Sequence, residues 1–274
     1  IEARLSKFAL DVVFNRKTTE WMRSYDGRNE EPVTLPVKFP LLLAQGADGI
    51  AVGLASKILP HNFIELINAA IAHLQGRDFV LYPDFPTGGI IMGRSGIRAA
   101  YATGRGKITL RGKAEIEETK NGKYRIVITE IPYKVRKKDL VKAIYDQAAD
   151  KKIEGIEDVV DYSSKRDGGI RIIVDLKKDA NPQVVLNRLF AQTAMQTTFS
   201  INMLALVNNQ TQPKILNLRH IIDEYLTFQE ELIVRRTKYD LKKAEERAHL
   251  LEGLLIAQDN IDEVIHIIRT SYDD

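Results

Sequence analysis

The side chains that most often carry out chemistry are absent from this sequence or widely scattered in it. The chain of 274 residues has no cysteine, which excludes thiol catalysis, disulfide bonds and cysteine-ligated zinc. No two histidines have the i, i+3 or i, i+4 spacing that would place both on one helix face as metal ligands. The five histidines are His61, His73, His220, His249 and His266. We therefore interpret each as a packing or surface residue and predict no metal site.

One glycine-rich stretch, Gly104-Arg105-Gly106-Lys107, has a composition similar to that of a phosphate-binding loop. It lacks the G-x-x-x-x-G-K-[ST] spacing and leads into a β-rich run, so the helix N-terminus that binds phosphate in such loops is missing. The sequence also has no G-x-S-x-G motif and no carboxylate pair that stands out. The residues by themselves therefore compose no active site.

Positive charge is concentrated in two stretches of the sequence. Lysine and arginine exceed aspartate and glutamate by 40 to 37, and a net charge of +3 alone does not indicate a nucleic-acid partner. Between Phe85 and Ala114, however, there is no acidic residue. The basic residues here are Arg94, Arg98, Arg105, Lys107, Arg111 and Lys113, and a second cluster comprises Lys134, Arg136, Lys137 and Lys138. Such segregation suits a polyanion, whereas the alternative is a solvated face whose acidic partners come from another segment; charge alone leaves both open.

An isoleucine lies in an unusually glycine-rich segment. Gly46, Gly49 and Gly53 surround Ile50 with residues that let the backbone approach another surface closely. The pattern alone favours a tight buried turn with Ile50 in the core. The alternative is that the segment approaches a partner outside the chain.

The middle of the chain predicts an α+β fold. β-rich runs at 107–118 and 124–131 are joined by a turn with an Asn121-Gly122 pair, a strong hairpin signal. A helix follows, with Leu140, Val141, Ile144, Tyr145 and Ala148 on one face. Two more strands are expected at 156–162 and 170–176 around a turn at 165–169, and Asn181-Pro182 opens another helix. This ββα–ββα order predicts an antiparallel sheet with helices on one face.

Two shorter helices and a loop are expected before this region. Leu5, Phe8, Ala9, Val12 and Val13 have helical spacing, so the chain begins inside a helical pattern. Residues 24–40 read as a loop. Asn62 and Glu65 form a capping-box-like helix start. The apolar residues expected on the buried face of that helix are Ile67, Ala70, Ile71 and Leu74.

The last quarter predicts one long helix over 217–258, about 60 Å long. Apolar residues recur along it at 3-4-3-4 spacing, as in two heptads of a coiled coil. They are Leu241, Ala244, Ala248, Leu251 and Leu255. No second long helix is expected in the chain, so the partner of this stripe should lie elsewhere, which indicates a segment of a longer protein. Asp259-Asn260 should end the helix, and another should begin at Ile261.

A series of short motifs also runs in order along nearly the whole chain. The first half carries Leu35-Pro36-Val37-Lys38-Phe39-Pro40, Gly49-Ile50-Ala51-Val52-Gly53, Pro60-His61-Asn62, Pro83-Asp84-Phe85-Pro86-Thr87-Gly88-Gly89, Tyr101-Ala102-Thr103-Gly104-Arg105-Gly106 and Glu130-Ile131-Pro132-Tyr133. The second half carries Gln192-Thr193, Asn202-Met203, Pro213-Lys214 and Arg247-Ala248-His249-Leu250-Leu251-Glu252. In this order the motifs resemble the breakage-reunion subunit of bacterial type IIA topoisomerases. Within that family the compact segment 79–83 favours the topoisomerase IV branch over the gyrase branch.

The resemblance implies a DNA-cleaving enzyme of the cytoplasm, with no membrane association. A homodimer of this subunit, with two copies of an ATPase subunit (the B subunit of topoisomerase IV), cuts one duplex, passes another through the break and reseals it. Magnesium and ATP are brought by the ATPase subunit. The nucleophile is a tyrosine. Because Glu2-Ala3-Arg4 match the residues that follow it in the family, with Ile1 in place of the usual threonine, the tyrosine is expected just before Ile1 and the chain alone should be inactive.

The resemblance also assigns the parts of the chain. Residues 1–25 are expected to end the winged-helix region, 26–216 to form the tower domain, 217–258 the coiled-coil helix, and 259–274 the start of a truncated exit-gate region through which the homodimer forms. In the family, an isoleucine in the Gly-Ile-Ala-Val-Gly stretch wedges between base pairs, and Ile50 matches it. The residues expected to bind double-stranded DNA are Ile50, Arg94, Arg105, Lys107 and Arg111.

Two other kinds of function stay open at this point. A non-enzymatic architectural protein could bend DNA with the same wedge and the same basic zone, and would have no tyrosine before Ile1. A scaffold could instead use its long helix to bind a protein partner, with the basic zone incidental. Steep salt dependence of duplex binding would count against the scaffold.

Overall fold

The computed structural model describes residues 4–15, 17–164, 169–207 and 212–272. By its internal contacts the chain divides into two compact units, which are described separately here. One unit comprises Ile1–Phe39 and Tyr225–Asp274, and the other comprises Pro40–Glu224. The functional domain boundaries expected from the sequence are a different kind of division and stay a prediction.

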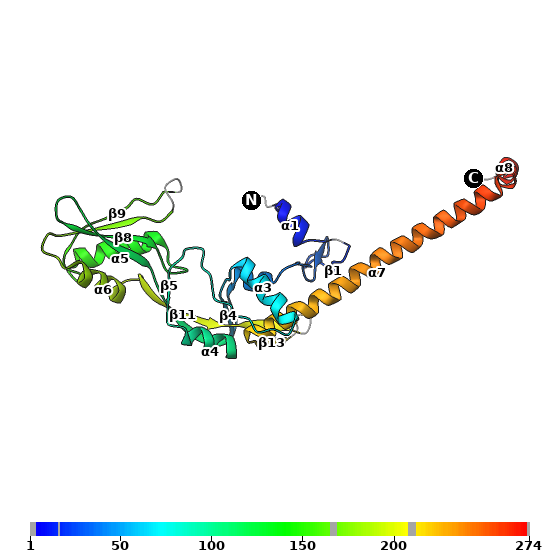
Figure 1. Ribbon diagram of the computed structural model, residues 1–274. Helices are drawn as coiled ribbons and strands as arrows, with labels where there is room; N and C mark the ends of the chain where they lie inside the picture. Colours follow the sequence, from blue (N-terminus) through cyan, green and yellow to red (C-terminus); the bar gives the residue numbers. More distant parts are fainter. Residues whose placement is uncertain (1–3, 16, 165–168, 208–211, 273–274) are drawn as a thin grey trace. The chain divides into compact units, whose positions relative to one another are not determined.

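The larger unit contains a four-stranded antiparallel sheet in the order β7-β8-β10-β9 (Figure 1). Its strands are β7 (Lys113–Glu118), β8 (Tyr124–Glu130), β9 (Ile156–Asp161) and β10 (Ile172–Leu176). Helix α5 (Lys137–Ala149) follows β8, and α6 (Pro182–Gln192) follows β10. The expected ββα–ββα order, the Asn-Gly hairpin and the Asn181 cap of α6 are therefore confirmed. The turn expected at 165–169 falls largely on 165–168, outside the described residues.

One face of this sheet is apolar because side chains alternate between the two faces of a strand. Ile126 and Ile128 of β8 share a buried cluster with Ile144 of α5 and Leu189 of α6, so both helices cover the same face. Tyr145 does not join them as the sequence suggested. It is exposed, because α5 turns only its Leu140 and Ile144 edge fully inward.

A second, five-stranded antiparallel sheet has the order β3-β4-β11-β6-β5. Its strands are β3 (Ala47–Ala51), β4 (Leu54–Ile58), β5 (Ile90–Met92), β6 (Arg105–Arg111) and β11 (Gln196–Asn202). The single run expected at 107–118 is therefore wrong, since it divides between the two sheets at Gly112. The Gly112 N–H donates to the Met195 carbonyl (2.8 Å) just beyond the end of the β6–β11 ladder, and Lys113 begins β7 in the other sheet.

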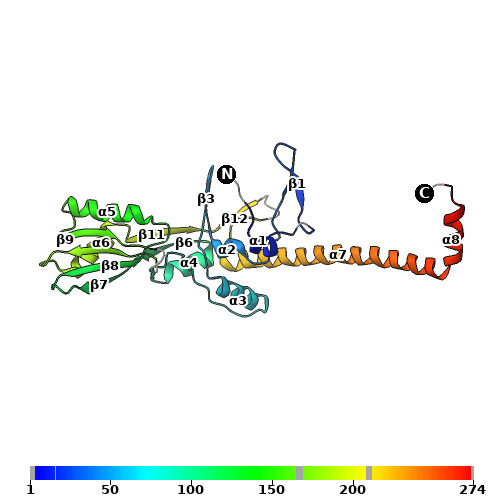
Figure 2. The same ribbon diagram turned by 90° about the horizontal axis from the view of Figure 1, so that it is seen from above.

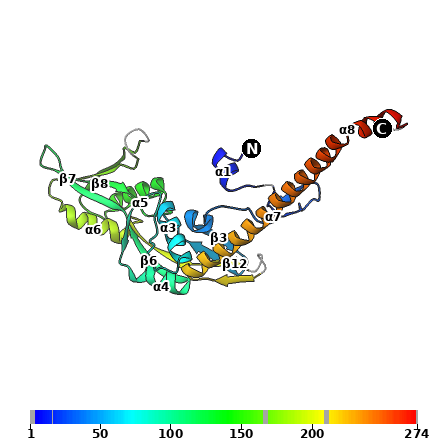
Figure 3. The same cartoon turned by 45° about the vertical axis from the view of Figure 1, so that its right-hand side comes forward.

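Helix α4 (Ser95–Thr103), which the sequence analysis did not anticipate, packs on one face of β6 (Figure 3). The contact is close because Gly106 has no side chain: a Cβ there would lie 2.8 Å from the Ala100 Cβ and 2.7 Å from the Gly96 carbonyl oxygen. The buried residues of α4 are Ile97 and Ala100. This contact fixes α4 on the face of β6 that carries Gly106, Ile108 and Leu110.

The larger unit contains several further elements. They are α2 (Leu41–Gln45), α3 (Phe63–Leu74), β12 (Leu204–Val207), β13 (Gln212–Ile215) and the start of α7 (Leu218–Asp259). The Asn62 side chain caps α3 as expected, accepting from Ile64 and Glu65 N–H. The expected buried face is correct in part. Ala70 is buried and Ile67 is half-buried, but Ile71 and Leu74 are exposed, and Leu66 and Ala69 are buried instead.

The smaller unit begins with α1 (Lys7–Val12), capped by the Ser6 side chain, so Leu5 lies before the helix rather than in it. A short hairpin follows, with β1 (Trp21–Arg23) and β2 (Glu30–Pro32) inside or beside the expected loop. Arg235 of α7 holds this region through the Thr18 carbonyl (3.0 Å) and the Glu20 carboxylate (2.8 Å).

Helix α7 is 42 residues long and matches the expected long helix to within one residue at each end. The next helix, α8 (Ile261–Thr270), begins where the sequence indicated. Leu241, Leu251 and Leu255 of the apolar stripe are exposed, since nothing among the described residues covers them. None of the described helices is both long and apolar enough to cross a membrane.

Candidate nucleic-acid interface

Ile50 lies on a hairpin that projects from the five-stranded sheet (Figure 2). β3 pairs with β4 in register, with Ile50 opposite Ala55 and the turn at Val52-Gly53. The Ile50 side chain is 87% exposed and Val52 is fully exposed. The buried turn that the pattern favoured is therefore wrong: the two-residue turn carries the strand beyond the sheet, where no other described element covers it. An exposed isoleucine on a protruding hairpin presents apolar surface to a partner.

Several contacts hold this hairpin on the sheet. Gly46, at its base, has φ +70°, and a Cβ there would lie 2.6 Å from the Ile58 carbonyl oxygen, so the close crossing requires glycine. The Asn202 amide donates to the Ala55 carbonyl at 2.6 Å, and the Ser56 hydroxyl donates to the Leu204 carbonyl at 2.7 Å. The hairpin is therefore anchored through backbone carbonyls of both its own strand and β12.

The hairpin also carries an ion pair to a neighbouring turn. The Lys134 ammonium lies 3.5 Å from the Asp48 carboxylate, and both side chains are partly exposed. Lys134 has φ +68°, an uncommon conformation for a residue with a side chain. Part of the second basic cluster therefore lies beside the hairpin.

The face of β6 opposite α4 is polar and cationic. Because side chains alternate along a strand, Arg105 and Lys107 share this face, and both are exposed. On β11 they lie opposite Asn202 and Ser200. The exposed Ser200 hydroxyl extends the polar face, whereas the Asn202 amide is engaged with the Ala55 carbonyl. The sequence analysis missed Ser200 because the pairing joins segments about 95 residues apart.

Arg111 is on the same strand, but its guanidinium already contacts other side chains of the protein. Its Nε and Nη2 donate to the Gln196 amide oxygen (2.8 and 2.6 Å), and its guanidinium lies 4.3 Å from the centre of the Phe190 ring. These contacts link β6 to β11 and α6. The structure therefore gives Arg111 a packing role rather than leaving its guanidinium free for a phosphate.

Arg94 is separated from the cationic face of β6. It directly precedes α4, which lies on the other face of that strand, and its guanidinium carbon is 5.8 Å from the centre of the Tyr82 ring. Of the four basic residues expected to bind DNA, the structure thus brings together Arg105 and Lys107. Arg94 and Arg111 lie in other surroundings.

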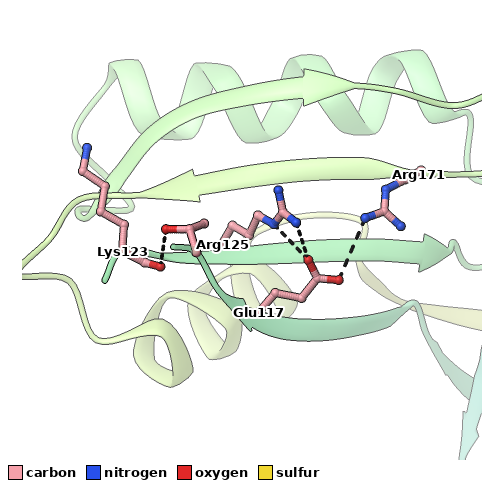
Figure 4. Close-up of polar contacts among 5 residues, drawn as sticks. Glu117, Lys123, Arg125 and Arg171 are labelled. Atoms are coloured by element: carbon pink, nitrogen blue, oxygen red, sulfur yellow. Dashed lines mark hydrogen bonds and ion pairs between the residues drawn. The ribbon is translucent and has the colours of Figure 1, made fainter. Parts of the chain in front are cut away.

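The acidic segments do not neutralise the basic stretch. Within the described part of the chain, none of the six basic residues between Phe85 and Ala114 forms an ion pair. Acids of the four-stranded sheet pair locally instead: Glu117 contacts Arg125 (2.6 Å) and Arg171 (3.9 Å), as Figure 4 shows. Glu157 pairs with Lys123 at 2.7 Å. The stretch 85–114 is therefore not neutralised by ion pairs among the described residues. In the second basic cluster, by contrast, acids from other segments do pair, Asp48 with Lys134 and Asp161 with Lys137.

His61 is buried, in agreement with the packing role expected from the sequence, but its partners were not anticipated. His61 Nδ1 lies 2.8 Å from the Leu43 carbonyl and Nε2 lies 2.5 Å from the Tyr101 hydroxyl. A carbonyl can only accept, so Nδ1 donates to it and the Tyr101 hydroxyl donates to Nε2. Burial lowers the pKa of His61 to about 4, and burial also raises the pKa of Tyr101. The neutral pair ties α2, which leads into the hairpin, to α4.

Among the described residues, no three histidine, aspartate or glutamate side chains gather as metal ligands would. What this surface offers a partner is an exposed apolar side chain on the β3–β4 hairpin and a polar cationic strand face in the same unit.

Comparison with known proteins agrees on one family. The family model that describes the A subunit of DNA gyrase/topoisomerase IV matches residues 1–274. The A subunit of DNA gyrase from Clostridium acetobutylicum (strain ATCC 824) is 51% identical over 280 residues, which cover 98% of this chain and 33% of that protein. The A subunit of DNA gyrase from Staphylococcus aureus (strain MRSA252) is 48% identical over 283 residues, covering 100% and 32%. The chain thus spans about a third of the length of the curated relatives it matches.

Proposed function

This chain belongs to the family of DNA gyrase and topoisomerase IV A subunits, and we propose that it is a segment of the DNA-cleaving subunit of a type IIA topoisomerase, where it binds and bends the duplex to be cut. The observation that carries the proposal is the exposure of Ile50 on a braced hairpin, in the same unit as the cationic face of β6.

Within the family we favour a gyrase-type protein. The relatives that are 51% and 48% identical are both named as the A subunit of DNA gyrase. The compact segment 79–83 favoured topoisomerase IV, but this indication rests on five residues. The similarity to gyrase A subunits extends along nearly the whole chain. The gyrase alternative is therefore the better supported of the two.

Ile50 supplies the wedge in this proposal. Inserting an apolar side chain between base pairs costs a few kcal/mol for partial unstacking, and this cost is offset when the bent duplex reaches more protein surface. Bending a site of 20–30 base pairs by 40–90° costs about 1–6 kcal/mol by elastic estimates. The hairpin alone does not offer enough contact to offset the costs of unstacking and bending. A second contact zone on the protein must therefore compensate for them.

Arg105 and Lys107 supply that second zone. Their side chains are exposed and form no ion pair with the described residues, so no internal ion pair must break before they reach a phosphate. Phosphate contacts add affinity and position the duplex without reading its sequence. Ser200 on the neighbouring strand is exposed and places a hydroxyl opposite Lys107.

The remaining parts of the reaction lie with other residues and partners in this proposal. The nucleophilic tyrosine precedes Ile1, a homodimer forms through the exit gate that 259–274 begin, and two copies of the ATPase subunit complete a heterotetramer in the cytoplasm. Magnesium and ATP are brought by that ATPase partner, as the resemblance to the family implies. The chain by itself is then inactive in cleavage.

The test is substitution of Ile50 in the full-length protein, reconstituted with its ATPase partner. Ile50→Ala removes most of the exposed apolar surface that would enter the duplex, so we expect less bending of an end-labelled duplex, measured by energy transfer, and slower plasmid supercoiling or relaxation. Ile64→Ala is the matched control, because Ile64 on α3 is also 69% exposed and lies outside the hairpin. Equal bending by both variants would contradict the wedge.

A non-enzymatic DNA-bending protein would use the same hairpin and the same cationic face. The two functions differ in what stands before Ile1 in the natural reading frame. A tyrosine there supports the cleaving enzyme. Its absence would leave DNA bending as the function.

A further inference from the structure

A cavity of about 420 Å³ lies in the larger unit, away from the proposed DNA contacts. It is formed by three segments: 79–82, the middle of α4 including Arg98, Tyr101 and Ala102, and 217–219 at the start of α7. Helix α4 packs on the face of β6 opposite Arg105 and Lys107, so the cavity and the cationic strand face belong to different sides of that strand. Its volume is within the range of small-molecule sites.

The walls of this cavity are largely aromatic and aliphatic. Phe79, Tyr82 and Tyr101 contribute rings, and Leu81, Ile97 and Leu218 contribute aliphatic surface. The Tyr101 hydroxyl is bonded to His61, so this ring has its polar atom satisfied away from any ligand. Flat apolar walls of this kind favour a planar ligand that can stack on them.

The charge around the cavity is positive. Arg98 and Arg219 line it, and the Arg94 guanidinium carbon lies 5.8 Å from the centre of the ring of Tyr82, another lining residue. Arg219 lies 5.0 Å from the centre of the Phe79 ring and pairs with Asp78, whose side chain is 95% exposed. Arg98 has no ion-pair partner among the described residues. The Asn217 side chain caps the first turn of α7 by accepting from the His220 N–H, so the positive end of a long helix also faces this region.

We propose that this cavity binds a small planar aromatic anion of the aryl carboxylate class. The rings of Phe79, Tyr82 and Tyr101 would stack on the aromatic part, and the guanidinium of Arg98 would pair with the carboxylate. Guanidinium and carboxylate match in shape and charge, which makes this pairing among the stronger polar contacts in proteins. The site is separate from DNA binding and does not depend on the function proposed above.

The test uses three fluorinated probes that share one aromatic ring and carry a negative, a neutral and a positive polar group: 4-(trifluoromethyl)benzoate, its amide and the corresponding benzylamine. Fluorine NMR of the full-length protein should show the benzoate binding with a dissociation constant on the order of 1 mM or below, with the amide weaker and the amine weakest. Arg98→Gln should weaken benzoate binding about tenfold and leave the amide unchanged. Equal binding of the benzoate and the amine would overturn the proposal.

A steric variant tests the location independently. Ala102→Phe places a ring inside the cavity and should abolish benzoate binding, whereas Ala99→Phe introduces the same ring on α4 at an exposed position that does not line the cavity. Circular dichroism confirms that both variants retain the fold. Benzoate binding that survives Ala102→Phe, or that both variants reduce equally, would show that the probe binds elsewhere.

Discussion

Two basic residues four positions apart on β6 have different surroundings, and this difference predicts different consequences of mutation. Lys107 is exposed, so Lys107→Gln should change the free energy of unfolding by no more than about 0.5 kcal/mol. It should also weaken the salt dependence of duplex binding. The negative slope of log K against log salt should become smaller in magnitude by about 1, because one phosphate contact is lost. Fluorescence titration of a labelled duplex at several salt concentrations measures this slope.

Arg111→Gln is the counterpart of that variant. The change removes the stacking on Phe190 and two hydrogen bonds to Gln196, so it should destabilise the protein by about 1–3 kcal/mol in a urea titration. The salt dependence of duplex binding by this variant should equal that of the unmodified protein. A weaker salt dependence of duplex binding for Arg111→Gln than for Lys107→Gln would show that the phosphate contact has been placed on the wrong residue.

His61 makes stability depend on pH. In the unfolded chain it takes up a proton near its ordinary pKa of 6.5, whereas in the folded protein burial holds the pKa to about 4. Between these values the unfolded state binds more protons, so stability should fall as pH drops from 6.5 toward 4, by about 3 kcal/mol in all. Urea titrations at pH 7 and pH 4.5 measure this loss. His61→Gln, which cannot titrate, should lose less over the same range.

At the level of single residues, the sequence predicted contacts between residues a few positions apart better than contacts between residues far apart in the chain. The caps at Asn62 and Asn181 follow from residues a few positions apart, and both are present. The exposure of Ile50 did not follow from the glycines around it, since hydrophobicity favours burial and only the β3–β4 pairing shows the protrusion. The bond between His61 and Tyr101 joins residues 40 positions apart, a distance over which a single sequence carries no pattern.

At the scale of elements, the contact between α4 and β6 depends on the absence of a side chain. Gly106→Ala would place a Cβ 2.7 Å from the Gly96 carbonyl oxygen and 2.8 Å from the Ala100 Cβ, so we expect a loss of about 1–3 kcal/mol in thermal or urea unfolding. Gly49→Ala is the matched control, because a Cβ at Gly49 meets nothing within 4 Å. If both substitutions cost the same, the loss reflects backbone entropy rather than packing.

Elements with strong periodicity were predictable and the others were not. The repeated ββα order and the long α7 were recognised because alternation and helical spacing persist over many residues. The run 107–118 was taken as one strand because nothing in its composition marks Gly112 as the point where the chain leaves one sheet for the other. Helix α4 begins at Ser95-Gly96 and has few large apolar residues, so its packing rather than its sequence identifies it.

At the scale of the whole molecule, acids and bases are arranged so that the basic stretch stays unneutralised. Acids of the four-stranded sheet pair with that sheet's own lysines and arginines, while the cations of 85–114 form no ion pair with the described residues. We expect duplex binding by the full-length protein to be largely independent of sequence. Its affinity should fall by about 10³–10⁵ between 50 and 200 mM salt if six to ten phosphates are contacted.

Electrophoretic mobility shift over that salt range checks the expectation. A scaffold that uses α7 alone to bind a protein partner would show little binding to duplex at any salt concentration. Weak salt dependence combined with tight binding would point instead to contacts with the bases.

The close crossing at Gly46 restricts how this protein can evolve. No side chain fits at that position, and the backbone there adopts a conformation that other residues rarely take, so the base of the hairpin is a fixed point. Because successive residues of a strand point to opposite faces, inserting or deleting one residue between Gly46 and Ile50 would turn the isoleucine toward the other side. Natural variants can therefore exchange the residue at position 50 far more readily than they can alter the four-residue spacing that aims it.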